Sequence, residues 1–193
     1  MKVLVLGSEG YIGSAATRKF LEEGHEVVEV DREREPGTDI ACGEDVEGLP
    51  GDVDAVLNAT GVSCVDWLEK DIPEGQDYLD ALEKLARKYE DVKFVHLSSL
   101  AALGLEGEYS GEPDPVLPYS RFKRETEKVV REFENSTVIR PAHVFSPGKP
   151  PGLLEVLPGP LVPVSENYTA AVRREKLVEV ISSALAADRE VLD

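Results

Sequence analysis

Short apolar runs alternate with longer amphipathic stretches along most of this chain. The apolar runs predict strands at residues 1–6, 26–30, 38–42, 53–59, 93–98 and 136–140. The amphipathic stretches predict helices at residues 14–23, 76–89 and 119–134, and a last helical pattern runs through Leu177, Val180, Ile181, Ala184 and Leu185. Apolar strands that alternate with helices are typical of a parallel sheet covered on both faces. The pattern therefore predicts a doubly wound α/β fold.

Glycines follow the first predicted strand at regular intervals. Gly7, Gly10 and Gly13 lie three positions apart and directly precede a predicted helix. Glycines let the backbone turn tightly and approach a pyrophosphate, which the free amides at the helix N-terminus then bind. This strand, glycine turn and helix predict a dinucleotide site, although the spacing differs from the common fingerprint.

An acidic residue, Asp31, follows the second predicted strand, about 20 residues beyond the glycines. A carboxylate there accepts hydrogen bonds from the adenosine ribose hydroxyls and repels a 2′-phosphate. We therefore expect NAD as the cofactor. Arg32 and Arg34 keep NADP as the alternative, because a guanidinium beside the carboxylate can pair with the extra phosphate. A solvated turn residue is the other interpretation of Asp31.

Tyr119 and Lys123 lie four residues apart in the third predicted helix, so they share one helix face. A nearby ammonium favours phenolate over phenol, which lowers a tyrosine pKa from its usual value of about 10. Such a tyrosine can exchange a proton with a substrate alcohol near neutral pH. By itself the spacing is more typical of a solvated surface pair than of a catalytic pair. The strand that ends in Ser98 and Ser99 adds hydroxyls that could hold a substrate oxygen, or that could merely satisfy local backbone groups.

Five segments resemble the extended short-chain dehydrogenase/reductase family, in the family's order. They are the glycine turn at residues 7–13, the strand and loop at 56–61, the strand at 94–99, the helix start at 118–123 and the segment at 139–148. The resemblance implies a Rossmann-type fold with a small C-terminal substrate lobe. The family includes NAD-dependent nucleotide-sugar epimerases, dehydratases and dehydrorhamnose reductases.

The resemblance also implies roles for particular residues. Ser99 would hold the substrate oxygen, Tyr119 would move the proton, and Lys123 would hold the cofactor ribose and stabilise phenolate; Ser98 is the alternative to Ser99. The cofactor would be bound by Gly7, Gly10, Tyr11, Ile12, Gly13, Asp31, Arg32, Ala59, Thr60, Gly61, Tyr119, Lys123, Pro141 and Val144. The substrate would be bound by Ser99, His143, Arg173 and Arg174.

Composition and net charge limit the classes of partner that the protein is expected to bind. A net charge of −17 opposes binding to nucleic acid or to an anionic membrane, because both are polyanions. The charge fits either a salt-adapted cytoplasm or simply a solvated acidic surface. We expect a cytoplasmic protein, because the chain has no run of about 20 apolar residues and its start has no signal-peptide pattern. Two cysteines, Cys42 and Cys64, and three scattered histidines predict no metal site.

The C-terminal part departs from the family's pattern. We expect one domain over residues 1–193, with residues 143–193 contributing a small lobe and a small or partly enclosed substrate. Residues 147–163 are rich in proline and glycine and predict a loop or lid beside the site, or a linker. Arg173 and Arg174 could receive the pyrophosphate of a nucleotide-activated substrate, or could balance neighbouring glutamates.

Two classes of function follow. The favoured one is an NAD(P)-dependent oxidoreductase or epimerase that acts on a nucleotide sugar or related carbohydrate, with a dehydrorhamnose-type reductase as the alternative. No acidic pair follows Ser99, which opposes the dehydratase branch, and Gly75 and Gln76 stand near the position of the family's proton-relay asparagine. The other class is a catalytically silent cofactor-binding subunit. The apolar faces of the helices at 76–89 and 119–134 suit either a homodimer or core packing.

Overall fold

The computed structural model describes residues 1–34, 38, 40, 46–61, 75–103, 118–147 and 171–187. Five parallel strands form its central sheet in the order β2-β1-β3-β4-β5. The strands are β1 (Lys2–Leu6), β2 (Glu26–Val30), β3 (Ala55–Asn58), β4 (Lys93–Leu97) and β5 (Ser136–Ile139). The register aligns Leu6 with Val30 on one side and with Asn58 on the other, and Asn58 with His96. The carboxyl ends of the strands therefore meet at one edge of the sheet.

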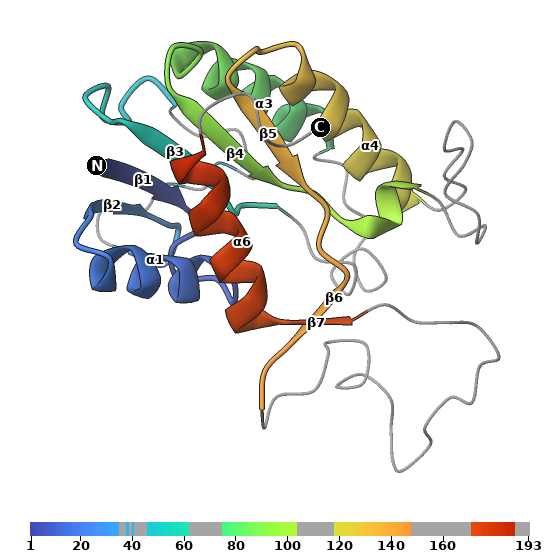
Figure 1. Ribbon diagram of the computed structural model, residues 1–193. Helices are drawn as coiled ribbons and strands as arrows, with labels where there is room; N and C mark the ends of the chain where they lie inside the picture. The colour runs from blue at the N-terminus through green and yellow to red at the C-terminus, as the bar shows by residue number, and fades with distance from the viewer. Residues whose placement is uncertain are drawn as a thin grey trace, which may run out of the picture.

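Helices cover both faces of this sheet (Figure 1). They are α1 (Gly13–Glu22) and α6 (Arg174–Ala186) on one face, and α3 (Gly75–Lys88) and α4 (Pro118–Arg131) on the other. A short 3₁₀ helix, η2 (Leu100–Leu103), follows β4 and packs against α4. The arrangement confirms the predicted doubly wound α/β fold.

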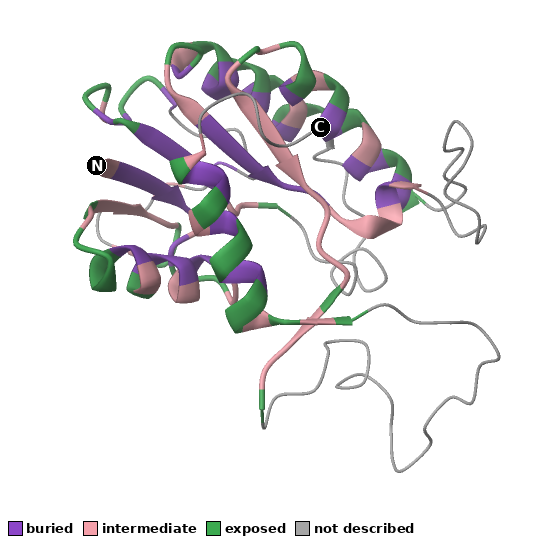
Figure 2. Cartoon of the chain, in the orientation of Figure 1, coloured by how far each residue is buried: buried purple, intermediate pink, exposed green. Residues whose placement is uncertain are grey.

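Alternation along β1 shows why the inner strands are mostly apolar. Val3 and Val5 pack in the cluster under α1 and α6, whereas Leu4 and Leu6 pack in the cluster under α3 and α4. Figure 2 shows the central strands buried and the outer helix faces exposed. Strands covered on both faces favour apolar residues on both faces, so they show no regular polar alternation. The apolar face of α3, including Tyr78 and Leu82, belongs to this core.

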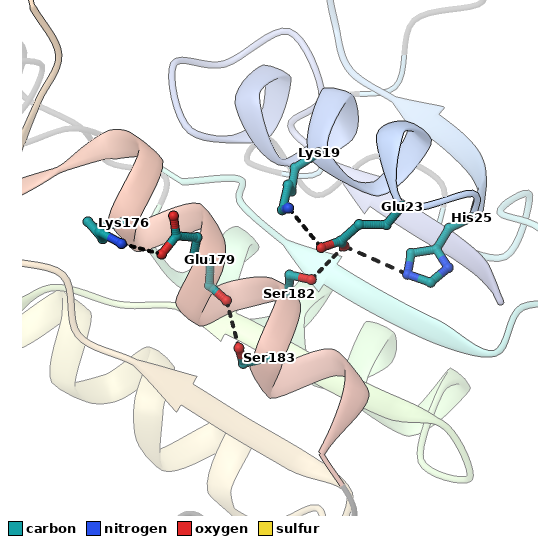
Figure 3. A network of polar contacts seen from close by, with 7 residues as sticks. All are labelled: Lys19, Glu23, His25, Lys176, Glu179, Ser182 and Ser183. Carbon is teal, nitrogen blue, oxygen red and sulfur yellow. Dashed lines mark hydrogen bonds and ion pairs between the residues drawn. The ribbon is translucent and has the colours of Figure 1, made fainter.

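Helices α1 and α6 are also joined by polar contacts at their exposed edge (Figure 3). The Glu23 carboxylate, just after α1, accepts a 2.6 Å hydrogen bond from the Ser182 hydroxyl of α6. Lys19 of α1 pairs with the same carboxylate at 3.0 Å, and His25 lies 3.9 Å from it. Both the serine and the lysine lower the Glu23 pKa. These contacts align the two helices so that both begin near the glycine turn, where Arg174 contacts Tyr11.

Two shorter strands lie beyond β5. Strand β6 (His143–Phe145) pairs in parallel with β7 (Ala171–Arg173), and β7 leads directly into α6. The predicted strand at 38–42 is wrong where the structure describes it. Thr38 lies outside any strand, and Ile40 lies in a 3₁₀ turn. The apolar side chain of Ile40 packs in the core cluster from that turn, so its burial needs no strand. The loop predicted beyond Pro147, and both cysteines, lie outside the described residues.

Among the residues that the structure describes, no helix is long and apolar enough to cross a membrane.

Candidate active site

The glycine turn follows β1, and the strand order reverses between β1 and β3. Gly7 donates its amide to the Val30 carbonyl at 2.8 Å, at the end of β2. Its φ of +80° favours glycine, and a Cβ there would lie 2.9 Å from the Ala59 carbonyl carbon and oxygen. Ala59 in turn donates its amide to the Leu6 carbonyl at 2.9 Å. The turn and the loop after β3 thus pack backbone to backbone at the switch point, where doubly wound sheets bind ligands.

The start of α1 packs closely against the glycine turn. Gly10 donates to the Gly7 carbonyl at 3.1 Å, and a Cβ on Gly13 would overlap that same carbonyl oxygen. The first turn of α1 therefore lies against the glycine turn, with no side chain between them at these positions. At this helix start the Ser14 amide donates to the Gly10 carbonyl at 2.9 Å, and the Ala16 amide donates to the Ile12 carbonyl at 3.0 Å. The predicted cofactor-binding roles of Gly7, Gly10 and Gly13 stay a prediction.

Asp31 is held in place at the end of β2. Its carboxylate accepts hydrogen bonds from the Glu9 amide at 2.9 Å and the Glu33 amide at 3.1 Å. The bond from Glu9 ties the acidic strand end to the glycine turn. The neighbouring cations are paired with acids: Arg34 contacts Glu9 at 2.5 Å and Glu29 at 2.8 Å. Arg32 is mostly exposed and lies 3.3 Å from Glu33.

Lys123 of α4 is only 5% exposed and points toward the loop after β3. A Cβ added to Gly61 would lie 3.2 Å from the Lys123 Nζ and 3.7 Å from the Tyr78 hydroxyl. The same Nζ lies 5.8 Å from the centre of the half-buried Tyr119 ring, one turn earlier in α4. Burial lowers the Lys123 pKa to about 8, and the negative charge of Glu127 partly opposes that shift. The structure thus brings together Tyr119, Lys123 and Gly61.

Ser98 and Ser99 differ in their contacts. Ser98 is 5% exposed, and its hydroxyl donates a 2.6 Å hydrogen bond to the buried Glu127 carboxylate. Arg140 donates to the same carboxylate at 2.8 and 2.5 Å, and this contact raises the Arg140 pKa. Ser99 is half-buried, and its hydroxyl oxygen accepts a 3.2 Å bond from the Ala101 amide, which leaves its hydrogen unused in that bond. This geometry favours Ser99 over Ser98 as a donor to a substrate.

Tyr11 and Arg174 meet at the edge of the glycine turn. The Tyr11 hydroxyl donates to the Ser146 hydroxyl at 2.9 Å, just after β6. The Arg174 guanidinium lies 4.7 Å from the centre of the Tyr11 ring and donates to the Tyr11 carbonyl at 3.5 Å. Arg174 is therefore close to the predicted cofactor loop. His143 and Arg173 are exposed, on β6 and β7.

The remaining predicted cofactor residues frame the site. Ile12, Ala59 and Val144 pack against the core under α1 and α6. Pro141 accepts a 3.0 Å hydrogen bond from the Leu100 amide, which holds η2 beside the segment that leads to β6. Thr60 donates its hydroxyl to the Asn58 side chain at 2.6 Å.

Several site residues escaped the sequence analysis: Glu9, Glu29, Asn58, Tyr78, His96, Thr126, Glu127, Arg140 and Ser146. Two signals were available. Asn58 and His96 are polar residues inside apolar runs, and Thr126 and Glu127 follow Lys123 by three and four positions, on its own helix face. Across the described ranges, no group of three or more His, Cys, Asp or Glu side chains is arranged to hold a metal ion.

The comparison with family models identifies the chain. Residues 3–158 match the model of the NAD dependent epimerase/dehydratase family, so the protein belongs to that family. A probable low-salt glycan biosynthesis reductase, Agl14 of Haloferax volcanii, is 31% identical over 158 residues. That match covers 72% of this chain and 52% of Agl14, so the chain spans about half the length of this curated relative.

Solved structures share the fold. The UDP-glucuronic acid 4-epimerase of Bacillus cereus, in complex with UDP-glucuronic acid and NAD, has a TM-score of 0.76 and 19% identity, over 100% of this chain and 75% of its own. A dTDP-glucose 4,6-dehydratase of Bacillus anthracis in complex with NAD has a TM-score of 0.73 and 20% identity, over 98% of this chain and 72% of its own. Human epimerase family protein SDR39U1 with NADPH has a TM-score of 0.71 and 22% identity, over 97% of this chain and 70% of its own.

Proposed function

We propose that the protein is an NAD-dependent oxidoreductase or epimerase that acts on a secondary alcohol or ketone of a nucleotide sugar. The burial of Lys123 carries this proposal. A buried ammonium destabilises a fold, yet this one lies beside Tyr119 and against Gly61, at the switch point where such folds bind dinucleotides. A residue kept at an unfavourable position indicates function.

Each residue would have a distinct task. Ser99 would donate a hydrogen bond to the substrate oxygen, and Tyr119 would give or take the proton of that oxygen. Lys123 would bind the cofactor ribose and stabilise the Tyr119 phenolate by its charge. A bound nicotinamide would supply or accept the hydride. The other cofactor contacts would come from the glycine turn, Asp31 and the loop at 59–61.

Pairing of Arg34 supports NAD over NADP. The guanidinium that would bind a 2′-phosphate is shared by the Glu9 and Glu29 carboxylates, and Asp31 adds a third negative charge beside the glycine turn. These carboxylates would repel a 2′-phosphate in this position, and they already compensate the charge of Arg34. Titration of both cofactors tests this point, and tighter binding of NADP than of NAD would contradict it.

The substrate class follows from chemistry and from relatives. The Bacillus cereus epimerase binds UDP-glucuronic acid, and Agl14 is named a reductase of glycan biosynthesis. The reductase name favours a sugar-nucleotide reductase as the second candidate. We propose that His143, Arg173 and Arg174 bind the substrate side, with the arginines facing its pyrophosphate. If Arg173→Ala with Arg174→Ala leaves the affinity for every nucleotide sugar unchanged, this assignment is wrong.

We further propose a cytoplasmic homodimer in which residues 1–193 form one domain and residues 143–193 contribute a small substrate lobe. The acidic charge and the family support a partner that is a small molecule rather than nucleic acid or membrane. Sedimentation at several protein concentrations tests the dimer, and a monomer at all of them would refute it.

Cofactor titration followed by a substrate screen tests the function. Calorimetry with NAD and NADP should show NAD binding. Incubation with UDP- and dTDP-sugars should then show either a change in nicotinamide absorbance or an epimerised product. NAD binding without turnover of any sugar nucleotide, together with no effect of Tyr119→Phe, would favour the silent-subunit alternative.

A further inference from the structure

A chain of buried polar side chains joins the loop after β3 to the helix that carries Lys123. Asn58, His96 and Thr126 are each 0% exposed. The Asn58 Nδ2 lies 3.2 Å from the His96 Nδ1, and the His96 Nε2 lies 3.2 Å from the Thr126 Oγ1. The Thr126 hydroxyl then reaches the Lys123 carbonyl at 2.7 Å. Three elements, β3, β4 and α4, are thereby connected across the core.

The direction of each hydrogen bond follows from its neighbours. The Asn58 Oδ1 accepts from the Thr60 amide at 3.1 Å and from the Thr60 hydroxyl at 2.6 Å, so the side chain turns its amide group toward His96. An amide nitrogen only donates, hence the His96 Nδ1 accepts. A neutral ring then carries its proton on Nε2 and donates it to Thr126. The Thr126 hydroxyl donates in turn to Lys123, so all donors along the chain point one way.

The surroundings keep this ring neutral. Burial, and to a smaller extent the charge of Lys123, lower the His96 pKa to about 3. The described titratable groups around Lys123 are Tyr119 and Glu127 on α4, His96 on β4 and Tyr78 on α3. Burial raises the Tyr78 pKa, so both Tyr78 and His96 are uncharged near neutral pH. Of Tyr78, His96 and Glu127, only the Glu127 carboxylate then brings a charge to the lysine.

We propose that His96 is a positioning residue that sets the distance between the cofactor loop and Lys123. The proposal rests on the proposed function, in which Lys123 binds the cofactor ribose. Lys123 is connected to the cofactor loop in two ways. Its Nζ lies against Gly61. Its carbonyl is linked to Thr60 by the hydrogen bonds that run through Thr126, His96 and Asn58. A break in this chain frees the turn of α4 to shift while the loop stays in place.

Variants at Thr126 test the proposal. Thr126→Val keeps the shape but removes the hydroxyl, which leaves the His96 N–H without its acceptor. We expect about 10-fold weaker NAD binding and a displaced midpoint in the pH dependence of that binding, which reports Lys123. Thr126→Ser restores the hydroxyl and should restore both values. The control is Thr17→Val on α1, which removes a buried hydroxyl that has no hydrogen-bond partner and should leave both values unchanged.

Nitrogen NMR of ¹⁵N-histidine-labelled wild-type protein gives a second measurement that needs no variant. His96 should show the neutral Nε2–H tautomer from pH 5 to 9. A proton on Nδ1, a His96 that titrates in that range, or a Thr126→Val protein that binds NAD like wild type would overturn this proposal alone. If wild-type protein binds neither NAD nor NADP, the proposed function falls and the positioning role falls with it.

Discussion

Replacement of Lys123 by methionine should stabilise the fold at neutral pH. The Lys123 side chain is buried, and its pKa falls from 10.5 to about 8 on folding. That difference corresponds to about 3 kcal/mol of unfavourable free energy while the folded lysine is charged. Methionine keeps most of the length of the side chain without the charge. The free energy of unfolding of Lys123→Met should therefore exceed that of wild type by about 3 kcal/mol at pH 7.

The pH dependence of the stability difference between Lys123→Met and wild type is a second test of this explanation. Below about pH 8 both the folded and the unfolded lysine hold the proton, so the whole penalty is present. Between about 8 and 10.5 only the unfolded chain holds it, so wild-type stability rises with pH. The advantage of the methionine variant should accordingly fall to about 1 kcal/mol at pH 10.

Urea denaturation of both proteins at pH 7 and pH 10 measures these differences. Lys128→Met is the matched control, because Lys128 lies on the same helix, is exposed, and pairs with Glu125 at 2.7 Å. Its effect should stay within about 0.5 kcal/mol at either pH. A Lys123→Met effect that is equal at both pH values, or a destabilised variant at pH 7, would refute the reasoning. The same variant should lose NAD affinity, so that stability rises as function falls.

Three other variants, one of them a double substitution, have defined outcomes. Glu127→Gln removes the acceptor charge from a buried network and should lower the free energy of unfolding by about 2–3 kcal/mol in urea titration; an unchanged midpoint would contradict the buried pairing. Gly13→Ala places a methyl group on a backbone carbonyl and should abolish NAD binding by calorimetry, whereas wild-type affinity would show that the turn relaxes easily. Glu9→Gln with Glu29→Gln should release Arg34 and improve NADP affinity about 10-fold, a gain that Arg34→Ala in the same background should remove.

Local patterns predicted most of the fold. The apolar runs of β1, β3 and β4 and the helix faces of α3 and α4 follow from burial on two faces, which the sequence displays directly. At Thr38 and Ile40, which the structure describes, the strand predicted at 38–42 was wrong, because an apolar residue can reach a core from a 3₁₀ turn as well as from a strand. Ile40 does so, at 1% exposure.

The candidate site was predictable where its residues are close in sequence. The pair of Tyr119 and Lys123 is a helix spacing, and the glycine turn is one contiguous segment. The contact of Asn58 with His96, and that of His96 with Thr126, depend on strand register and on which helix covers which face. The pairing of Arg34 with Glu9 and Glu29 likewise depends on tertiary structure, because a chain with many glutamates offers several partners.

Turnover of nucleotide sugars by wild-type and Tyr119→Phe protein tests the central claim most directly. With NAD present, chromatography of products from a panel of UDP- and dTDP-sugars should show conversion of at least one of them by wild type. The phenylalanine variant should still bind NAD but convert that sugar at least about 100-fold more slowly, because it has no proton to exchange. Equal conversion by the two proteins would contradict the account.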